Sequence, residues 1–586
     1  MIPLRVEIEQ VLQSAFGRLG YDAAYARTVR SNRPDLCQFQ CNGALAMAKK
    51  VGKAPREIAG DIVALLVDDT RFSRVEIAGP GFINMTLSDT YLASYGSQSA
   101  HEEPTWDSTG KTVVVDFAGP NVAKPMHVGH LRSAIIGDSL QRLFRTVGYN
   151  VISDNHLGDW GTQMGMLITE LQRRMPELPY FDSLQTEGFP ETPPLTIHEL
   201  ETMYPEASKA CKEDPERMKE AVEATDELQR GRPGYLALWK HFVALSTETL
   251  HRDFSRLGVH FDHWLGESFY MDRMGRVVEE LTRDGFVYES QGAQVMDVSR
   301  PDDSKEIPPV MLEKSGGGFL YATSDIATIE YRMKEFSPAR ICYVVDKRQA
   351  LHFEQVFRAV RMAEIVSHTV SLEHVGFGTV NGKDGKPFKT REGGVMKLAE
   401  LMDLVINRAA ERMEESGIGR DASEEEKNEI ARMVGIAALK FADLSNHRLS
   451  DYVFDIDKFS RFEGKTGPYI LYSAVRIKSI LRKVQAAGFS SGEILPFRHD
   501  SERDLLLELG RLGDVYEKAA EDCAPNYLCD YVYDLSQVFN RFYRDCHIMK
   551  EADTALRGSW ISLCQWTLKT VEDVLSILGI VVPEKM

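Results

Sequence analysis

A short run of the sequence combines two histidines, a lysine and a glycine in a pattern that suits phosphate chemistry. The run from Pro120 to His130 contains Lys124, His127 and Gly129. If a helix begins within it, free backbone N–H groups and the positive dipole end favour a bound phosphate. The imidazoles and the ammonium add donors that can follow charge developing on an α-phosphate, and Gly129 leaves space for a nucleotide. Such histidines could otherwise be helix caps, but a position where a strand turns into a helix favours catalysis.

The elements that position these residues are typical of a nucleotide-binding sheet. Three consecutive valines within residues 112–117 predict a parallel strand buried on both faces. Helical spacing of apolar residues follows over 131–147 and stops at Gly148, and a short strand is predicted at 151–153. The strand pattern returns at 341–346. We therefore expect a doubly wound sheet that is split in the sequence by an insertion.

The length of 586 residues exceeds one ordinary core, so several domains are expected. The expected fold class is multidomain α/β plus α. A Rossmann-like parallel-sheet catalytic domain with a helical insertion stands between an N-terminal α+β domain and a C-terminal helical bundle. Residues 75–78 and 82–87 predict two strands around a Gly-Pro-Gly turn in the N-terminal domain. The expected limits are 1–105 for the N-terminal domain, 106–396 for the Rossmann-like domain with its insertion at about 165–265, 397–455 for a helical connection, and 456–586 for the C-terminal helical domain.

Composition excludes some classes of function. A formal net charge of −18 argues against a general nucleic-acid coat, because phosphate binding relies on Lys and Arg. A local basic face that recognises one folded RNA by shape stays possible. No stretch approaches about 18 consecutive apolar residues and the first residues lack a secretory signal, so we expect a cytoplasmic protein without membrane contact. The eight cysteines form no Cys-x-x-Cys pair, which predicts reduced thiols and no structural zinc or other metal site.

The histidine run resembles the signature of a known family. His127-Val128-Gly129-His130 is similar to the His-Ile-Gly-His signature of class I aminoacyl-tRNA synthetases, and the longer run from Asp116 to Arg132 resembles the arginyl branch. The resemblance covers essentially the whole chain. It continues through Asn155-His156-Leu157-Gly158-Asp159-Trp160-Gly161-Thr162-Gln163, Tyr321-Ala322-Thr323-Ser324-Asp325-Ile326-Ala327, Val345-Asp346-Lys347-Arg348-Gln349, Lys386-Pro387-Phe388-Lys389-Thr390-Arg391, Gly467-Pro468-Tyr469 and Pro583-Glu584-Lys585-Met586.

The resemblance implies an enzyme that activates L-arginine with ATP and Mg²⁺ and transfers it to the 3′ adenosine of tRNA(Arg). It also implies a monomer that needs its tRNA even for the first step. ATP would be bound by Pro120, His127, Gly129, His130 and Lys389.

The second signature of the class departs from the usual pattern here. Most members have Lys-Met-Ser-Lys-Ser, but the matching loop contains Lys389 and Arg391 and lacks the second lysine. Many arginyl enzymes lack this lysine too. In them a lysine just before the first signature is thought to supply the missing positive charge. That position is Lys124 here. The implied catalytic residues are therefore Lys124, His127, His130, Lys389 and Arg391.

Arginine recognition also has a physical reading, because a planar guanidinium with five donors is best bound by carboxylates. Asp116 and Asp325 match family positions that bind the guanidinium, and Tyr321 would pack beside it. Asn121 and Gln349 resemble the residues that hold the α-amino and carboxylate groups. A lone Asp would otherwise be interpreted as a surface or cap residue.

Both ends of the chain are expected to bind tRNA. Tyr469, Tyr472 and Arg476 are spaced so that they share one helix face, and they match family residues near the anticodon loop. By periodicity alone, Tyr472 could equally be core. Phe82 and Asn84 resemble residues that contact the tRNA D-loop, although a purely structural hairpin would give the same pattern. The implied tRNA-binding residues are Phe82, Asn84, Tyr469, Tyr472, Arg476 and Met586.

Two other functions stay open from the sequence. A class I synthetase for another amino acid is the first, but paired acids would be a poor lining for a neutral amide side chain. A noncatalytic RNA-binding paralogue is the second, and the intact Lys124, His127 and His130 argue against it.

Overall fold

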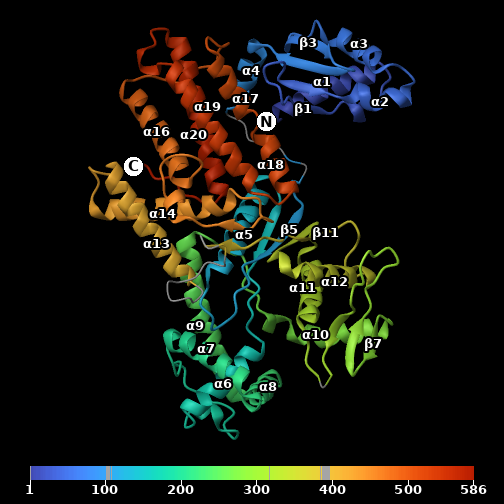
Figure 1. The fold of residues 1–586 in the computed structure, drawn as a ribbon, viewed down its shortest axis with the longest axis vertical. Helices are drawn as coiled ribbons and strands as arrows, with labels where there is room; N and C mark the ends of the chain where they lie inside the picture. The colour runs from blue at the N-terminus through green and yellow to red at the C-terminus, as the bar shows by residue number, and fades with distance from the viewer. Residues whose placement is uncertain (1, 101–105, 107, 316, 383–384, 386–395) are drawn as a thin grey trace. The chain divides into compact units, whose positions relative to one another are not determined.

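The computed structural model describes residues 2–100, 106, 108–315, 317–382, 385 and 396–586. The chain forms two compact units, shown as a ribbon in Figure 1. The first consists of residues Met1–Thr109, Ala410–Phe441 and Ser460–Met586, and the second of Gly110–Ala409 and Ala442–Phe459.

The N-terminal part of the first unit is an α+β fold, as expected. Its antiparallel sheet has the strand order β1-β2-β4-β3. The predicted strands at the Gly-Pro-Gly turn are confirmed as β3 (Phe72–Ala78) and β4 (Phe82–Leu87), which pair with each other. The other elements are α1 (Leu4–Arg18), η1 (Ala23–Tyr25), β1 (Thr28–Arg30), β2 (Phe39–Cys41), α2 (Gly43–Val51), α3 (Pro55–Leu66) and α4 (Asp89–Ser99).

The last third of the chain is helical, which confirms the expected bundle. Long amphipathic helices with apolar faces supply its core, including the fully buried Leu535 and Val574. Figure 1 draws these helices in orange and red. The elements are α13 (Leu398–Ser416), α14 (Glu424–Leu444), α15 (Ile456–Phe459), α16 (Gly467–Ala486), α17 (Asp500–Leu509), α18 (Leu512–Glu521), α19 (Asn526–Asp545), η5 (Ile548–Lys550) and α20 (Thr554–Ile577).

The second unit contains the predicted parallel sheet. Its strand order is β11-β10-β5-β6, and every neighbouring pair is parallel. The strands are β5 (Thr112–Phe117), β6 (Asn150–Asp154), β10 (Arg340–Val344) and β11 (Ser371–His374). The register aligns Asp116 with Asp154 on one side and with Tyr343 on the other, so these polar side chains meet near the carboxyl ends of the strands. Ligands of open α/β sheets bind at this edge.

Helix α5 (Val128–Thr146) connects β5 to β6 and confirms the predicted βαβ unit. The helix packs closely against the strand because Gly137 faces the ring of Phe117. A Cβ atom at Gly137 would lie 2.1 Å from Phe117 Cγ. Gly148, with φ of 89°, ends the connection in the left-handed conformation that favours glycine.

A group of helices is inserted between β6 and β10, where the sequence predicts a helical insertion. It lies at the lower end of Figure 1 and has its own core around Leu167, Leu200 and Leu238. The elements are α6 (Thr162–Arg174), η2 (Pro179–Phe181), α7 (Ile197–Glu213), α8 (Pro215–Gln229) and α9 (Pro233–Leu257).

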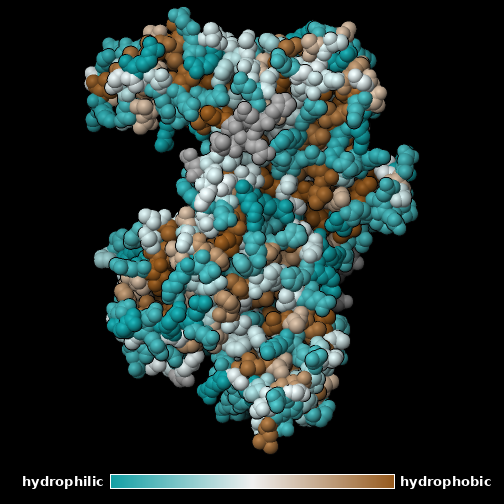
Figure 2. Space-filling model, turned by 180° about the vertical axis from the view of Figure 1, so that it is seen from behind, coloured by the Kyte–Doolittle hydropathy of each residue, from teal (hydrophilic) through white to brown (hydrophobic). Residues whose placement is uncertain are grey.

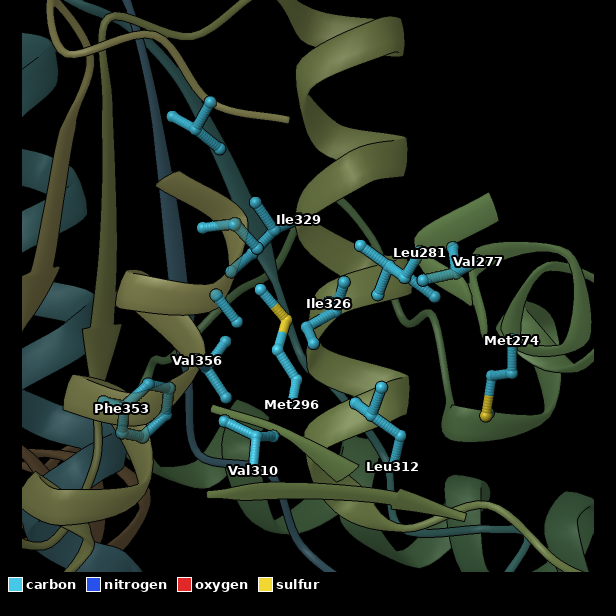
Figure 3. Packing of buried hydrophobic residues seen from close by; sticks show 14 of the residues in the cluster. Met274, Val277, Leu281, Met296, Val310, Leu312, Ile326, Ile329, Phe353 and Val356 are labelled. Atoms are coloured by element: carbon cyan, nitrogen blue, oxygen red, sulfur yellow. The ribbon is translucent and has the colours of Figure 1, made fainter. Parts of the chain in front are cut away.

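A three-stranded antiparallel sheet with the order β7-β8-β9 lies in the second unit, in a part of the chain where no strands were predicted. Figure 3 shows Met296, Ile326 and Val356 pointing toward one another between this sheet and two helices. Each fully buried side chain of this size stabilises the fold by about 1.5–3 kcal/mol. The elements are η3 (Glu267–Tyr270), α10 (Met271–Arg283), β7 (Val287–Ser290), β8 (Ala293–Met296), β9 (Val310–Glu313), α11 (Tyr321–Phe336), η4 (Lys347–Gln349), α12 (Ala350–Met362), β12 (Val380–Asn381) and β13 (Tyr452–Val453).

Hydrophilic residues cover much of the face shown in Figure 2, with hydrophobic residues in separate groups among them. Among the residues that the structure describes, no helix is long and apolar enough to cross a membrane.

Candidate active site

The loop between β5 and α5 is shaped by an unusual backbone turn. Ala118 and Gly119 both have positive φ, at 74° and 54°. One hydroxyl fixes this turn, because Ser133 Oγ accepts from the Ala118 N–H at 2.8 Å and donates to the Val344 carbonyl at 2.6 Å. The loop, the first turns of α5 and strand β10 are therefore held together by a single side chain.

The two signature histidines cap α5, and their rings lie against each other at a tilt of 39°. His127 Nδ1 accepts from the Gly129 N–H at 3.0 Å, and His130 Nδ1 accepts from the His127 N–H at 3.1 Å. Their ring centroids are 4.0 Å apart. Gly129 is required for this arrangement, since a Cβ atom there would lie 2.6 Å from Cε1 of His127. The capping role considered from the sequence is thus real, and neither Nε2 atom has a hydrogen-bond partner in the described part of the chain.

Both histidines are uncharged at neutral pH. Burial, assisted by the neighbouring His127, lowers the pKa of His130 to about 3. Burial and the charge of Lys124 also lower the pKa of His127. Because each Nδ1 accepts a hydrogen bond, the ring proton of each neutral imidazole sits on Nε2. The pair therefore offers two uncharged Nε2–H donors beside a helix N-terminus.

A cavity of about 540 Å³ opens beside these histidines. It brings together six of the residues predicted to act, namely Asp116, Asn121, His127, Gly129, His130 and Asp325. Its other lining residues include Phe117, Ala118, Gly119, Arg132, Ser133, His156, Gly158, Glu267, Asp346, Arg348, Phe353 and Phe377. The size suits a nucleotide together with a small molecule.

The loop residues before the histidines contact the run that follows β6. The Pro120 carbonyl accepts from the Gly158 N–H at 3.1 Å, and Val122 N–H donates to the Gly158 carbonyl at 3.0 Å. Asn121 Oδ1 lies so close to Gly158 that a Cβ atom there would be 2.3 Å away. Pro120 itself is buried and does not line the cavity.

Lys124 lies near the histidines without lining the cavity. Its Nζ is 4.9 Å from the ring centroid of Tyr204 on α7, and its charge is felt by both His127 and His130. Lys389 and Arg391 of the second signature lie outside the described residues.

The carboxylate of Asp116 is occupied by a residue of the chain itself. Arg332 Nη2 donates to Asp116 Oδ2 at 2.6 Å and to Asp154 Oδ2 at 2.8 Å, and all three side chains are buried. Although burial opposes the charge, Asp116 and the nearby Tyr343 and Asp154 raise the pKa of Arg332 well above its usual value. Asp116 thus forms the floor of the cavity as part of an internal ion pair.

Two other carboxylates face the cavity and have no arginine partner among the residues that the structure describes. Asp325, on α11, accepts from or shares a proton with His352 Nε2, 2.5 Å from its Oδ2. Glu267, in η3, lines the same cavity. Burial, together with the charges of Asp159 and Asp325, raises the pKa of Glu267 to about 7, and His156 opposes this effect. We call Glu267 and Asp325 the acidic pair, and a cation beside them would favour the ionised form of Glu267.

Two predicted residues lie elsewhere. Tyr321 is 66% exposed and lines a second cavity of about 350 Å³, which shares Glu267 with the first. Gln349 is exposed at the end of η4 and is not among the cavity residues, whereas its neighbours Asp346 and Arg348 are.

The residues predicted to face the anticodon loop form one polar face in the first unit. Tyr472 is 44% exposed, which rules out a core position. Asn540 of α19 donates to Tyr469 Oη at 3.0 Å and accepts from Arg476 at 3.4 Å, and Gln537 donates to the same Oη at 2.7 Å. The guanidinium of Arg476 lies 5.1 Å from the ring centroid of Tyr543. The amide of Asn540 thus links the Tyr469 hydroxyl to the Arg476 guanidinium, which lies over a second aromatic ring.

The other predicted RNA-binding residues differ in exposure. Asn84 is only 4% exposed, and its Oδ1 accepts from Gln40 Nε2 at 2.9 Å. Phe82 is partly exposed on the same strand. Met586 is partly exposed, and the residues before it are held by Arg482, which donates to the Glu584 carbonyl at 2.8 Å.

Four residues of these sites could not be identified from the sequence, namely Glu267, Arg332, His352 and Asn540. Arg332 left a usable signal, because it lies seven residues after Asp325 and so shares its helix face. Glu267 left none, since nothing in the sequence relates it to a strand end more than a hundred residues away.

Comparisons with known proteins match the whole chain. A family model described as "tRNA synthetases class I (R), catalytic domain" matches residues 98–456. Models of the DALR anticodon binding domain and the arginyl tRNA synthetase N terminal domain match residues 470–586 and 4–87. The chain is 48% identical to an arginine–tRNA ligase of Alkaliphilus oremlandii and 47% identical to one of Maricaulis maris, each over 99% of both chains. It is similar to the crystal structure of arginyl-tRNA synthetase from Plasmodium falciparum, with a TM-score of 0.82, 26% identity and 100% of both chains covered.

The parallel sheet, the histidine pair at the start of its first helix and the catalytic-domain match define a class I aminoacyl-tRNA synthetase. Within this class, the matches to the DALR anticodon binding domain and to the arginyl tRNA synthetase N terminal domain indicate the arginyl branch. The chain belongs to the arginyl-tRNA synthetase family, and the activity that goes with this family is that of an arginine–tRNA ligase.

Proposed function

We propose that the cavity beside His127 and His130 carries out both steps of this reaction, with Mg·ATP as substrate. The carboxylate oxygen of arginine attacks the α-phosphorus, and pyrophosphate leaves with the electrons of the broken P–O bond. A hydroxyl of the terminal adenosine of tRNA(Arg) then attacks the carbonyl carbon and loses its proton to solvent, and AMP leaves with the electrons of the broken C–O bond. The observation that carries the proposal is that two uncharged Nε2–H donors and an acidic pair open into one cavity.

The histidines are suited to the first step because neither needs to lose or gain a proton. Their Nε2–H groups can donate to the α-phosphate oxygens, whose negative charge grows in the transition state. The N-terminus of α5 adds its dipole at the same place. Lys124 supplies a nearby cation, as does the second-signature loop with Lys389 and Arg391, in the proposed scheme.

The acidic pair is suited to the guanidinium of arginine. The charge of Asp325 disfavours the ionised form of Glu267, and a planar cation between the two carboxylates would offset that repulsion. Asp116 was expected to share this role, but its carboxylate is held by Arg332. We therefore assign the guanidinium to Asp325 and Glu267, with Asp116 and Asn121 beside the α-amino group.

This assignment makes arginine use depend on pH. Only ionised Glu267 attracts the guanidinium, and its pKa is raised to about 7. Lowering the pH from about 8 to about 6 should therefore reduce kcat/KM for arginine roughly tenfold, because kcat/KM reports the ionisation of the free enzyme. The measurement is the exchange rate at subsaturating arginine with excess tRNA. A Glu267→Gln variant should lack this dependence, and a flat wild-type profile would argue against the pair.

The face around Tyr472 is proposed to stack bases of the anticodon loop. Tyr472→Ala should raise the KM for tRNA by an amount equivalent to about 1–3 kcal/mol, the value of one base stacked on an aromatic ring. Tyr472→Phe keeps the ring and should behave like wild type. The KM for arginine at saturating tRNA should not change in either variant. If the Ala and Phe variants had the same KM for tRNA, Tyr472 would not stack on a tRNA base.

We also propose that the protein acts as a monomer, since one chain holds both the cavity and the candidate RNA face, and that it works in the cytoplasm.

A further inference from the structure

A cluster of three possible metal ligands lies in the C-terminal helices, apart from the residues that the proposed reaction uses. It consists of His499, Glu502 and Cys546, each of which offers a ligand atom within 4.8 Å of the other two. His499 immediately precedes α17, Glu502 lies in its first turn, and Cys546 immediately follows α19. The cluster therefore joins the start of one helix to the end of another.

The carboxylate of Glu502 provides a second, independent observation. Glu502 is 0% exposed. Its Oε1 accepts from the backbone N–H groups of Arg498 and His499, at 3.0 and 2.9 Å. Its Oε2 is also buried but has no hydrogen-bond partner among the residues that the structure describes. A buried carboxylate oxygen without a donor is costly, so it calls for a proton or a cation.

The chemistry of the three donors selects the cation. A thiolate, an imidazole and a carboxylate together favour zinc over magnesium or calcium, which prefer oxygen ligands alone. The charge of Zn²⁺ would be balanced by one carboxylate and one thiolate. Zinc bonds of about 2.0–2.3 Å hold ligands roughly 3.5 Å apart, so small side-chain rotations would close the set. His499 is partly exposed, which gives water access to a fourth position.

A similar trio beside the catalytic cavity serves as a contrast. Asp116, Asp154 and His156 also lie within 4.8 Å of one another. Arg332 already donates to both carboxylates there, so a cation of the chain itself occupies that place. No such donor reaches Glu502 Oε2 within the described part of the chain.

We propose that His499, Glu502 and Cys546, with water as the fourth ligand, form a zinc site that fastens the start of α17 to the end of α19. No zinc site was predicted from the sequence, because the cysteines form no Cys-x-x-Cys pair and Glu502 and Cys546 lie far apart in the chain.

The proposal is tested on the full-length chain after removal of metals by a chelator. Titration with Co²⁺ should bind about one equivalent and produce the thiolate-to-cobalt charge-transfer absorption that sulfur ligation gives. Zn²⁺ should displace the cobalt and raise Tm, since a ligand that binds only the folded state stabilises it. Cys546→Ser should abolish the charge-transfer band, and His499→Ala should weaken binding.

Cys529→Ser is the matched control, because Cys529 is a buried thiol of α19 outside the cluster. This variant should keep the wild-type band and the wild-type response of Tm to zinc. The proposal is overturned if the wild-type chain gives no charge-transfer band, or if the band persists in Cys546→Ser. A wild-type chain without the band overturns the proposal even if a variant folds poorly.

Discussion

Asp325→Asn is expected to lower kcat/KM for arginine. The expected loss of transition-state stabilisation is about 3–5 kcal/mol, the range for removing one partner of a buried charge pair. The effect corresponds to roughly 10²- to 10⁴-fold. Glu267→Gln should act in the same direction, because the two carboxylates line one cavity and their charges interact. The measurement is arginine-dependent ATP–pyrophosphate exchange with tRNA in excess, and the KM for ATP should change little.

The same acidic pair should determine which amino acids are accepted. Citrulline keeps the planar shape but lacks the charge, and lysine keeps the charge but lacks the fork of donors. Both should be poor substrates by about 10⁴-fold or more, because they leave polar groups of the site unpaired. Canavanine retains both features and should compete closely with arginine.

The control for these variants is Glu289→Gln, which changes an exposed carboxylate on β7 and should leave kcat/KM for arginine unaltered. If Asp325→Asn and Glu267→Gln behaved like this control, or if citrulline were activated nearly as well as arginine, the acidic pair would not be the guanidinium site.

His130→Ala and His127→Ala are each expected to lower the rate of arginine activation by about 10²-fold or more. This is the scale of losing one preorganised donor to a developing negative charge. The geometry gives each ring a single free Nε2–H, since Nδ1 is used for capping α5. Pre-steady-state measurement of adenylate formation at saturating ATP, arginine and tRNA would report the chemical step.

The capping role means that the Ala variants lose a helix cap as well as a donor. His127→Asn separates the two effects, because Asn can still cap the helix and carries a side-chain N–H. It should restore Tm toward the wild-type value while recovering only part of the rate. Binding of tRNA should be nearly unchanged in all variants. Wild-type rates in both Ala variants would contradict the phosphate assignment.

The parallel sheet could be predicted from the sequence because buried strands leave a strong local signal. The valine run of β5 and the strand pattern of β10 are apolar stretches of the right length. The small sheet of β7, β8 and β9 could not, since its strands are only four residues long and partly exposed. Short, half-exposed strands carry little periodicity.

The candidate site was predicted in part for a related reason. Spacing and motif locate His127 and His130 because they are neighbours in the sequence. The pairing of Arg332 with Asp116 joins residues 216 positions apart, so no local pattern reveals that the predicted carboxylate is already occupied. Likewise, helical periodicity places Tyr472 on a face but does not decide whether that face is buried. Its 44% exposure comes from the packing of the surrounding helices.

Amino-acid-dependent ATP–pyrophosphate exchange, run across a panel of amino acids with and without tRNA(Arg), tests the central claim most directly. We expect exchange with arginine, close competition by canavanine, and no comparable exchange with citrulline, lysine, cysteine or glutamine. We also expect that exchange with arginine requires the tRNA. Exchange that is supported best by another amino acid, or by none in the presence of tRNA, would contradict the assignment of this cavity to arginine activation.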